Sequence, residues 1–293
     1  MTGGALLLLA ALGAADVCPP AGYTVEQLSQ LKFIDFAVPA DEVRQALALA
    51  LTGCLGDPRP AIRDGIAFEA LSKWMRGAQL DQATLRALRD ILVPGLDVKD
   101  AAGFRAPFSA LVMSEVARTD RVKPWMTADE REALVQAATR YLPAVKDYRG
   151  FSDTEGWRHG VAHGADLVLQ LALNPGINKP QLDRLLEAVA SQVSPAAAPA
   201  YHNAEPERLA QPVFYIAQRG MHDETEWDAW FARVLNPAPL ASWDDAFSSE
   251  AGLSKRHNTL EFILVLHAAA SDSANPNVAR MLPALREALK RVQ

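Results

Sequence analysis

The 293-residue chain contains only two cysteines, Cys18 and Cys54, too few for a disulfide scaffold or a cysteine-based zinc module. Basic residues are outnumbered, 29 Lys and Arg against 35 Asp and Glu, which gives a formal net charge of −6. A nucleic-acid binder needs a basic stripe that neutralises phosphates, so this balance excludes nucleic acid from the expected partners. Beyond the N-terminal segment, no stretch reaches the roughly 18 apolar residues of a transmembrane helix.

Several sequence patterns are also missing. The chain has no set of alternating Val, Ile and Thr strands joined by Asn-Gly or Asp-Gly turns, so a sheet protein is not expected. It has no Gly-x-Ser-x-Gly elbow, Walker loop, dinucleotide fingerprint or EF-hand loop. What is present is a globular composition, with 49% hydrophobic and 22% charged residues, enough for one large or two small domains.

Apolar residues recur at intervals of three and four, which predicts helices. The segments Ala61–Met75 and Asp81–Leu92 show this spacing, and Thr127 and Glu130 have the spacing of a capping box at another helix start. Five helix starts carry an early arginine, at intervals of 42, 53, 50 and 48 residues: Arg63, Arg105, Arg158, Arg208 and Arg256. This period favours an all-α fold of stacked helical hairpins, an α-α superhelix like HEAT or armadillo solenoids. The alternative is a non-repeating helical bundle.

The N-terminus has the character of a targeting segment. Residues Ala5–Ala15 form an apolar run, and Gly13 and Ala15 fit the −3 and −1 positions of a cleavage site, although no basic residue precedes the run. We therefore expect a signal peptide over 1–15, an extension over 16–45, a single helical repeat domain over 46–293, and a periplasmic or secreted protein. The alternative is a short buried N-terminal helix.

Export would leave Cys18 and Cys54 in an oxidising compartment, where they can pair and tie the N-terminal extension to the first helical layer. The alternative is two separate thiols.

The central block carries the sharpest chemical signal. A helix that begins near Glu155 places His159, His163 and Asp166 at i, i+4 and i+7, on one face. Two imidazoles one turn apart are a geometry that divalent transition metals use, and a carboxylate on the same face is a third ligand or orients one histidine. The sequence therefore suggests a zinc-like ion as a cofactor. The alternative is a solvated polar face.

A second helix adds to this constellation. His257 and Glu261 lie in a stretch that is apolar nearly all round, so we expect Glu261 to be buried and to need a partner. If the first helices of successive hairpins line one surface, the two helices face a common groove, and Asp64 holds the equivalent position in the first hairpin. The alternative is a set of internal salt bridges. The candidate groove comprises Trp157, Arg158, His159, His163, Asp166, His257, Glu261, Asp64 and Arg149, and the candidate metal ligands are His159, His163, Asp166, His257 and Glu261.

The central block also resembles a known family. The residues Asp147-Tyr148-Arg149-Gly150-Phe151, Gly156-Trp157-Arg158-His159, Ala162-His163 and Asp166 are similar to the bacterial family called domain of unknown function 2785. The likeness extends from about Ala46 to Val234, and the resemblance implies an all-helical protein without a known biochemical activity.

Two functions from different classes remain. The first is an exported, non-enzymatic helical-repeat protein that binds a peptide or protein in a concave groove. The second is a metal-dependent hydrolase that uses the face of His159, His163 and Asp166. Convergent imidazoles and carboxylates favour the enzyme, whereas side chains scattered along an open apolar groove favour binding.

Overall fold

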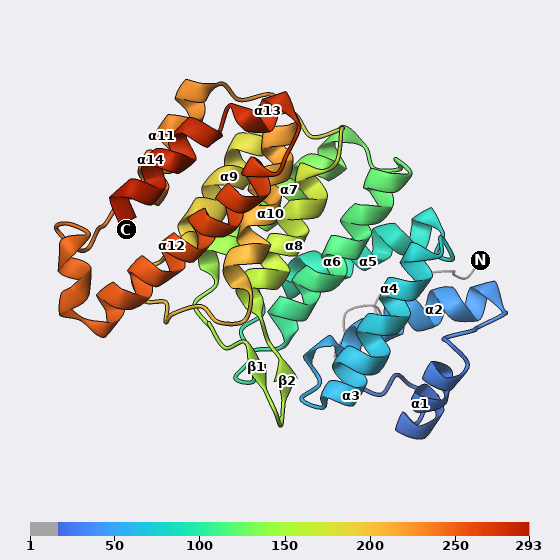
Figure 1. Ribbon diagram of the computed structural model, residues 1–293. Helices are drawn as coiled ribbons and strands as arrows, with labels where there is room; N and C mark the ends of the chain where they lie inside the picture. The colour runs from blue at the N-terminus through green and yellow to red at the C-terminus, as the bar shows by residue number, and fades with distance from the viewer. Residues whose placement is uncertain (1–16, 293) are drawn as a thin grey trace, which may run out of the picture. The chain divides into compact units, whose positions relative to one another are not determined.

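A computed structural model describes residues 17–292, so the predicted signal segment 1–15 lies outside the described residues. The described chain is mostly helical (Figure 1). Within it, only β1 (Phe151–Ser152) and β2 (Gly156–Trp157) form strands, and they pair in a two-stranded sheet. The all-α prediction is confirmed, while the superhelical stacking of hairpins stays a prediction. None of the helices in 17–292 is long and apolar enough to cross a bilayer.

The described residues form two compact units. Unit 1 runs to Thr119 and takes in Ser152–Arg158, and unit 2 comprises Asp120–Phe151 and the chain from His159 onward. The predicted boundary after residue 45 falls inside a continuous helix, α2 (Asp41–Leu51).

Unit 1 holds the N-terminal helices, several of which begin where the sequence predicts. Asp81 caps α5 by accepting a hydrogen bond from Thr84 N at 2.7 Å. A disulfide joins Cys18 to Cys54, whose Cα atoms lie 4.9 Å apart, and so ties the N-terminal extension to a buried turn. Besides α2, the unit contains α1 (Val25–Phe33), the 3₁₀ turn η1 (Thr52–Gly56), α3 (Pro60–Ile62), the π-helix η2 (Arg63–Phe68), α4 (Glu69–Arg76), α5 (Gln82–Gly95) and most of α6 (Arg105–Val122).

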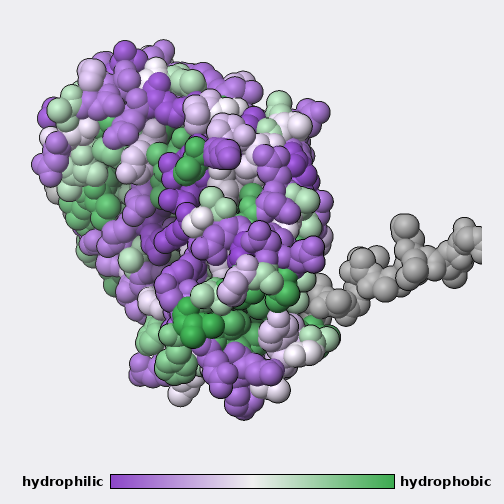
Figure 2. All heavy atoms as spheres, turned by 90° about the vertical axis from the view of Figure 1, so that its right-hand side faces the viewer, coloured by the Kyte–Doolittle hydropathy of each residue, from purple (hydrophilic) through white to green (hydrophobic). Residues whose placement is uncertain are grey.

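The surface of unit 1 carries exposed apolar side chains at the end of α1 and on α2. Phe33 is 89% exposed, Ile34 55% and Val43 46%. Figure 2 looks onto the side of Figure 1 that carries these helices, and it shows apolar residues gathered on part of a largely hydrophilic surface. Single exposed apolar residues are common on protein surfaces, but a patch of them is unfavourably hydrated and is typical of an interaction surface.

Unit 2 holds the remaining helices. Capping boxes start α7 at Thr127 and α9 at Asn178. In each, the cap side chain accepts from the backbone N–H of the third helical residue, and the cap backbone N–H donates to the side chain of that residue. Helix α10 packs between α8 and α12, and α7 packs against α9 (Figure 1). The elements are α7 (Ala128–Ala144), α8 (Gly160–Ala172), α9 (Lys179–Val193), α10 (Glu205–Gln218), α11 (Glu224–Val234), η3 (Asp244–Ser248), α12 (Glu250–Ser271), α13 (Pro276–Ala279) and α14 (Leu282–Val292).

A glycine allows α8 to approach α7 closely. A Cβ atom added at Gly164 would lie 2.9 Å from Leu142 Cδ1 and 3.0 Å from Tyr141 Cε1, both on α7. Real side chains do not approach so closely, so the helices would have to separate or the α7 side chains move. The cost of about 1 kcal/mol for a glycine inside a helix is therefore offset by close packing.

Replacing this glycine tests the packing. We expect Gly164→Ala to lower the free energy of unfolding by about 1–3 kcal/mol, because overpacking outweighs the gain in helix propensity. Gly65→Ala is the matched control, since its Cβ would meet only Lys32 Nζ at 3.4 Å. Urea unfolding of both variants is the measurement. A Gly164→Ala protein as stable as the parent would show that α7 and α8 are not tightly packed here.

Candidate functional site

The predicted histidine face lies at the N-terminus of α8, in unit 2. The helix begins at Gly160 and not near Glu155, because His159 is the N-cap residue and has left-handed backbone angles, φ 57° and ψ 41°. Its backbone N–H donates to Arg149 O at 3.1 Å, which fixes the chain as it enters the helix. A left-handed conformation is costly for a residue other than glycine, and such strain is typical of sites that the surrounding structure holds firmly.

His159, His163 and Asp166 are buried, so the alternative of a solvated polar face is wrong. The two imidazole rings pack edge to face, with centroids 5.7 Å apart. Asp166 forms an ion pair with Arg208, one turn into the neighbouring α10. The predicted face therefore packs against another helix and does not point into water.

The start of α10 has the same unusual backbone as the start of α8. Its N-cap residue, Ala204, also has a positive φ, 63°. The next residue, Glu205, is buried, and its carboxylate accepts a hydrogen bond from Asn203 N at 2.8 Å. Glu205 Oε1 lies 3.8 Å from His159 Nε2. Two strained helix starts thus meet at a buried histidine and a buried carboxylate.

Burial determines the charge of His159. Desolvation lowers its pKa from the ordinary value of 6.5, because a buried imidazolium loses hydration, while Glu205 opposes this shift and Arg208 adds to it. The imidazole is therefore neutral at pH 7. The structure pairs Asp166 with a guanidinium, and among residues 17–292 no group of three or more His, Cys, Asp or Glu side chains is placed to hold a metal ion. A zinc-like ion stays a prediction of the sequence.

The second helix of the predicted constellation, α12, packs against α10. His257 is exposed on α12, and its Nε2 is 3.1 Å from Tyr201 O. The expectation of a buried Glu261 is wrong, since that side chain is only half-buried. Solvent reaches this part of α12, where Leu264 is 39% exposed. Tyr201 belongs to the segment that leads into α10, so this segment lies beside His257.

The remaining candidates also have other partners. Arg149 is exposed and pairs with Asp147, and Trp157 is 38% exposed in β2. Arg158 belongs to unit 1, where its Nε donates to Ala102 O at 2.6 Å and its guanidinium lies 4.2 Å from the Phe104 ring centroid. Asp64, also in unit 1, pairs with the fully buried Arg63 at 2.7 Å. Arg149, Arg158 and Asp64 each contact a partner within their own unit.

A groove that the sequence did not indicate lies between α10 and α12. Its volume is about 350 Å³, and most of its lining is apolar. Tyr201 N donates to Asn258 Oδ1 at 2.6 Å, and beyond α12 Asn277 donates to Gln218 O at 3.2 Å, so the helices run in the same direction. The groove follows both helices and is lined by Glu207, Ala210, Gln211, Phe214, Tyr215, Val265, Leu266 and Ala269.

Another pocket, between α9 and α11, contains a histidine–carboxylate pair that sequence reasoning also missed. His222 Nε2 lies 2.7 Å from Asp183 Oδ1, and Lys179 reaches both Asp183 and Glu226. Asp183 follows Lys179 by one helical turn, and this spacing of opposite charges is the sequence signal that indicates an ion pair here. Each of these charges has an opposite charge beside it, so the pocket is best explained as an ionic network that joins the two helices.

Comparison with known proteins places the chain in a family. Residues 96–267, more than half of the chain, match the family described as "Protein of unknown function (DUF2785)", and the chain belongs to it. The match starts later and ends later than the likeness seen in the sequence. No curated protein and no solved structure matches the chain.

The pKa shift of His159 predicts how stability depends on pH. The folded protein resists protonation of His159, whereas the unfolded chain takes up the proton near pH 6.5. The contribution of neutral His159 to the free energy of unfolding is therefore complete above pH 6.5. It is lost as the pH falls toward the lowered pKa, and the free energy of unfolding then decreases by at most about 1.4 kcal/mol per pH unit. We expect His159→Asn to flatten this slope, because asparagine tolerates the left-handed conformation and does not titrate.

Urea unfolding between pH 5 and 8 is the measurement for this prediction. His202→Asn makes the same substitution at an exposed histidine and is the matched control. An unchanged slope in His159→Asn would mean that His159 is not the buried titrating group.

Proposed function

We propose that the protein binds a short amphipathic segment of a protein partner in the groove between α10 and α12. The observation that carries the proposal is the groove itself, an apolar channel along two parallel neighbouring helices. Small side chains at Ala210 and Ala269 leave space beside the larger Phe214 and Leu266. A helix that lays its apolar face into such a groove is a recurring mode of peptide recognition.

Charge defines the partner further. Glu207 is exposed and lines the groove, and Glu261 is half-buried on α12, one turn before Val265. Among residues 17–292, no lysine or arginine lines the groove, and the whole chain has a net charge of −6. The favoured partner therefore combines an aliphatic or aromatic anchor with a basic flank, because opposite potentials guide association and exclude acidic competitors.

The architecture and compartment proposed with this function have their own support. Support for the superhelical stack comes from α10, which packs between α8 and α12, as the first helices of successive hairpins would. The Cys18–Cys54 disulfide supports export to the periplasm or outside the cell, because disulfides persist in oxidising compartments. The alternative, a metal-dependent hydrolase at His159, His163 and Asp166, lacks support from side chains that converge on one point.

A designed peptide tests the proposed function. The probe is an amphipathic helix of about twelve residues, or three turns, with leucines on one face and lysines on its flanks. Its counterpart carries glutamates in place of the lysines. We expect the basic peptide to bind at least about tenfold more tightly, a difference of about 1.4 kcal/mol, as measured by fluorescence anisotropy.

Two neighbouring alanines provide matched variants. Ala269 and Ala268 are both exposed, but only Ala269 lines the groove. Ala269→Glu should weaken binding of the basic peptide by about tenfold or more, because a carboxylate occupies the apolar channel. Ala268→Glu should leave the affinity unchanged. Equal binding by both variants, or equal binding of both peptides, would contradict the proposal.

A further inference from the structure

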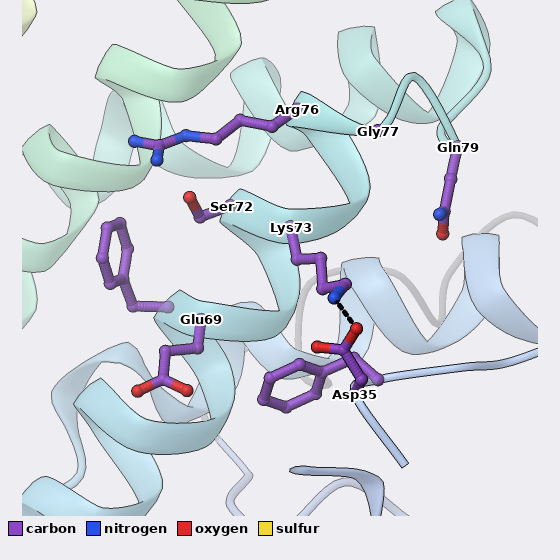
Figure 3. Close-up of a pocket in the computed structure, with 9 residues that line it drawn as sticks. Asp35, Glu69, Ser72, Lys73, Arg76, Gly77 and Gln79 are labelled. Atoms are coloured by element: carbon purple, nitrogen blue, oxygen red, sulfur yellow. Dashed lines mark ion pairs between the residues drawn. The ribbon is translucent and has the colours of Figure 1, made fainter.

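A second pocket lies in unit 1, on one face of α4, and residues 96–267 of the family match do not include its lining. Its volume is about 650 Å³, and it opens broadly to solvent. Figure 3 shows the side chains that line it. The end of α1 supplies Asp35 and Phe36, α4 supplies Ser72, Lys73 and Arg76, and Phe68 lies at the end of the preceding π-helix. The pocket is independent of the proposed peptide groove.

Unusual backbone gathers around this pocket. Asp35 and Phe36 are consecutive residues with φ of 56°, and Ala78, between the lining residues Gly77 and Gln79, has φ of 52°. The π-helix Arg63–Phe68 ends at the pocket wall. Left-handed residues other than glycine and π-helical turns are both costly and both occur often at functional sites. Trp74 holds the strained turn, because its Nε1 donates to Phe36 O at 2.9 Å.

Ser72 is the polar group that points to a ligand. Its side chain lines the pocket although the residue is only 7% exposed. Between residues 17 and 292 its hydroxyl has no hydrogen-bond partner. The Ser72 oxygen is not one of the enclosed polar atoms that lack a partner, so the hydroxyl faces the open pocket, where a ligand can replace water.

Arg76 stands beside this hydroxyl. Phe68, Ser72 and Arg76 follow one another at intervals of four residues, which places them on one stripe of the helix. Figure 3 shows Ser72 and Arg76 projecting from the same side of α4, while Lys73 turns toward Asp35, with which it forms an ion pair. Arg76 uses Nε and Nη2 to bind the buried Glu115, so other N–H donors of its guanidinium can face the pocket.

We propose that this pocket binds a small organic carboxylate with an aromatic or alkyl body. The Ser72 hydroxyl and the outward N–H groups of Arg76 donate hydrogen bonds to the carboxylate, and the rings of Phe36 and Phe68 cover the apolar body. The lining carboxylates do not repel such a ligand strongly, because Asp35 pairs with Lys73 and Glu69 with Lys32. Charge-assisted hydrogen bonds from arginine are the ones that carboxylates favour most.

Three compounds with one common body test this assignment: 3-phenylpropionate, 3-phenylpropanol and 3-phenylpropylamine. Each is titrated into the full chain at pH 7.5 and followed by chemical-shift changes in NMR spectra. We expect the carboxylate to bind at least about fivefold more tightly than the alcohol, with the amine weakest. Tighter binding of the amine would assign the pocket to cations through Asp35 and Glu69 and would overturn the proposal, as would equal binding of all three.

Variants locate the binding. Ser72→Ala removes only the hydroxyl and should weaken 3-phenylpropionate binding about fivefold, while Ser191→Ala on α9 serves as the matched control and should bind as the parent does. Arg76→Lys keeps a positive charge for the buried Glu115, so it should fold and still bind more weakly, because the planar guanidinium fork is lost. Parent-like affinity in both Ser72→Ala and Arg76→Lys would overturn the assignment.

Discussion

The contact between the starts of α8 and α10 is the interaction on which unit 2 depends. Asp166 pairs with Arg208, and His159 lies beside Glu205. Asp166, His159 and Glu205 are buried, whereas Arg208 is partly exposed. Loss of one partner would leave a buried charge uncompensated, which is strongly destabilising. With one face of α10 held in this way, its other face is turned toward α12, and the groove between those two helices results.

The most distinctive residues of the family segment therefore have architectural roles. His159 starts α8 in a strained conformation, Asp166 joins two helices, and in unit 1 Arg158 stacks on Phe104. None of these contacts requires a bound ligand. The two surfaces that we propose to bind ligands are lined by other residues: alanines and Phe214 in the groove, and Ser72 and Arg76 in the pocket of unit 1. Membership in a family of unknown function assigns no activity, because function depends on the chemistry of particular sites.

Local signals in the sequence predicted the helices well, because capping depends on residues three apart. Thr127 and Asp81 cap the helices that the sequence predicts there. The start of α8 was missed, since the left-handed turn at His159 is fixed by Arg149 and Glu205, which are distant in the sequence. Burial of Glu261 was wrong for the same reason: an apolar stretch does not reveal which face of α12 stays open. No sequence motif predicted the α10–α12 groove or the Ser72 pocket, because the residues that line each of them come from separate segments that become neighbours only on folding.

The central claim is that α10 is structural on its α8 side and binds a partner on its α12 side. Hydrogen–deuterium exchange of the full chain, with and without the basic amphipathic peptide, tests it most directly. The account predicts slower exchange in peptides from Glu205–Gln218 and from the second half of α12, with no change in α4 or α5. Protection centred on the start of α8, or none in α10 and α12 at saturating peptide, would contradict it.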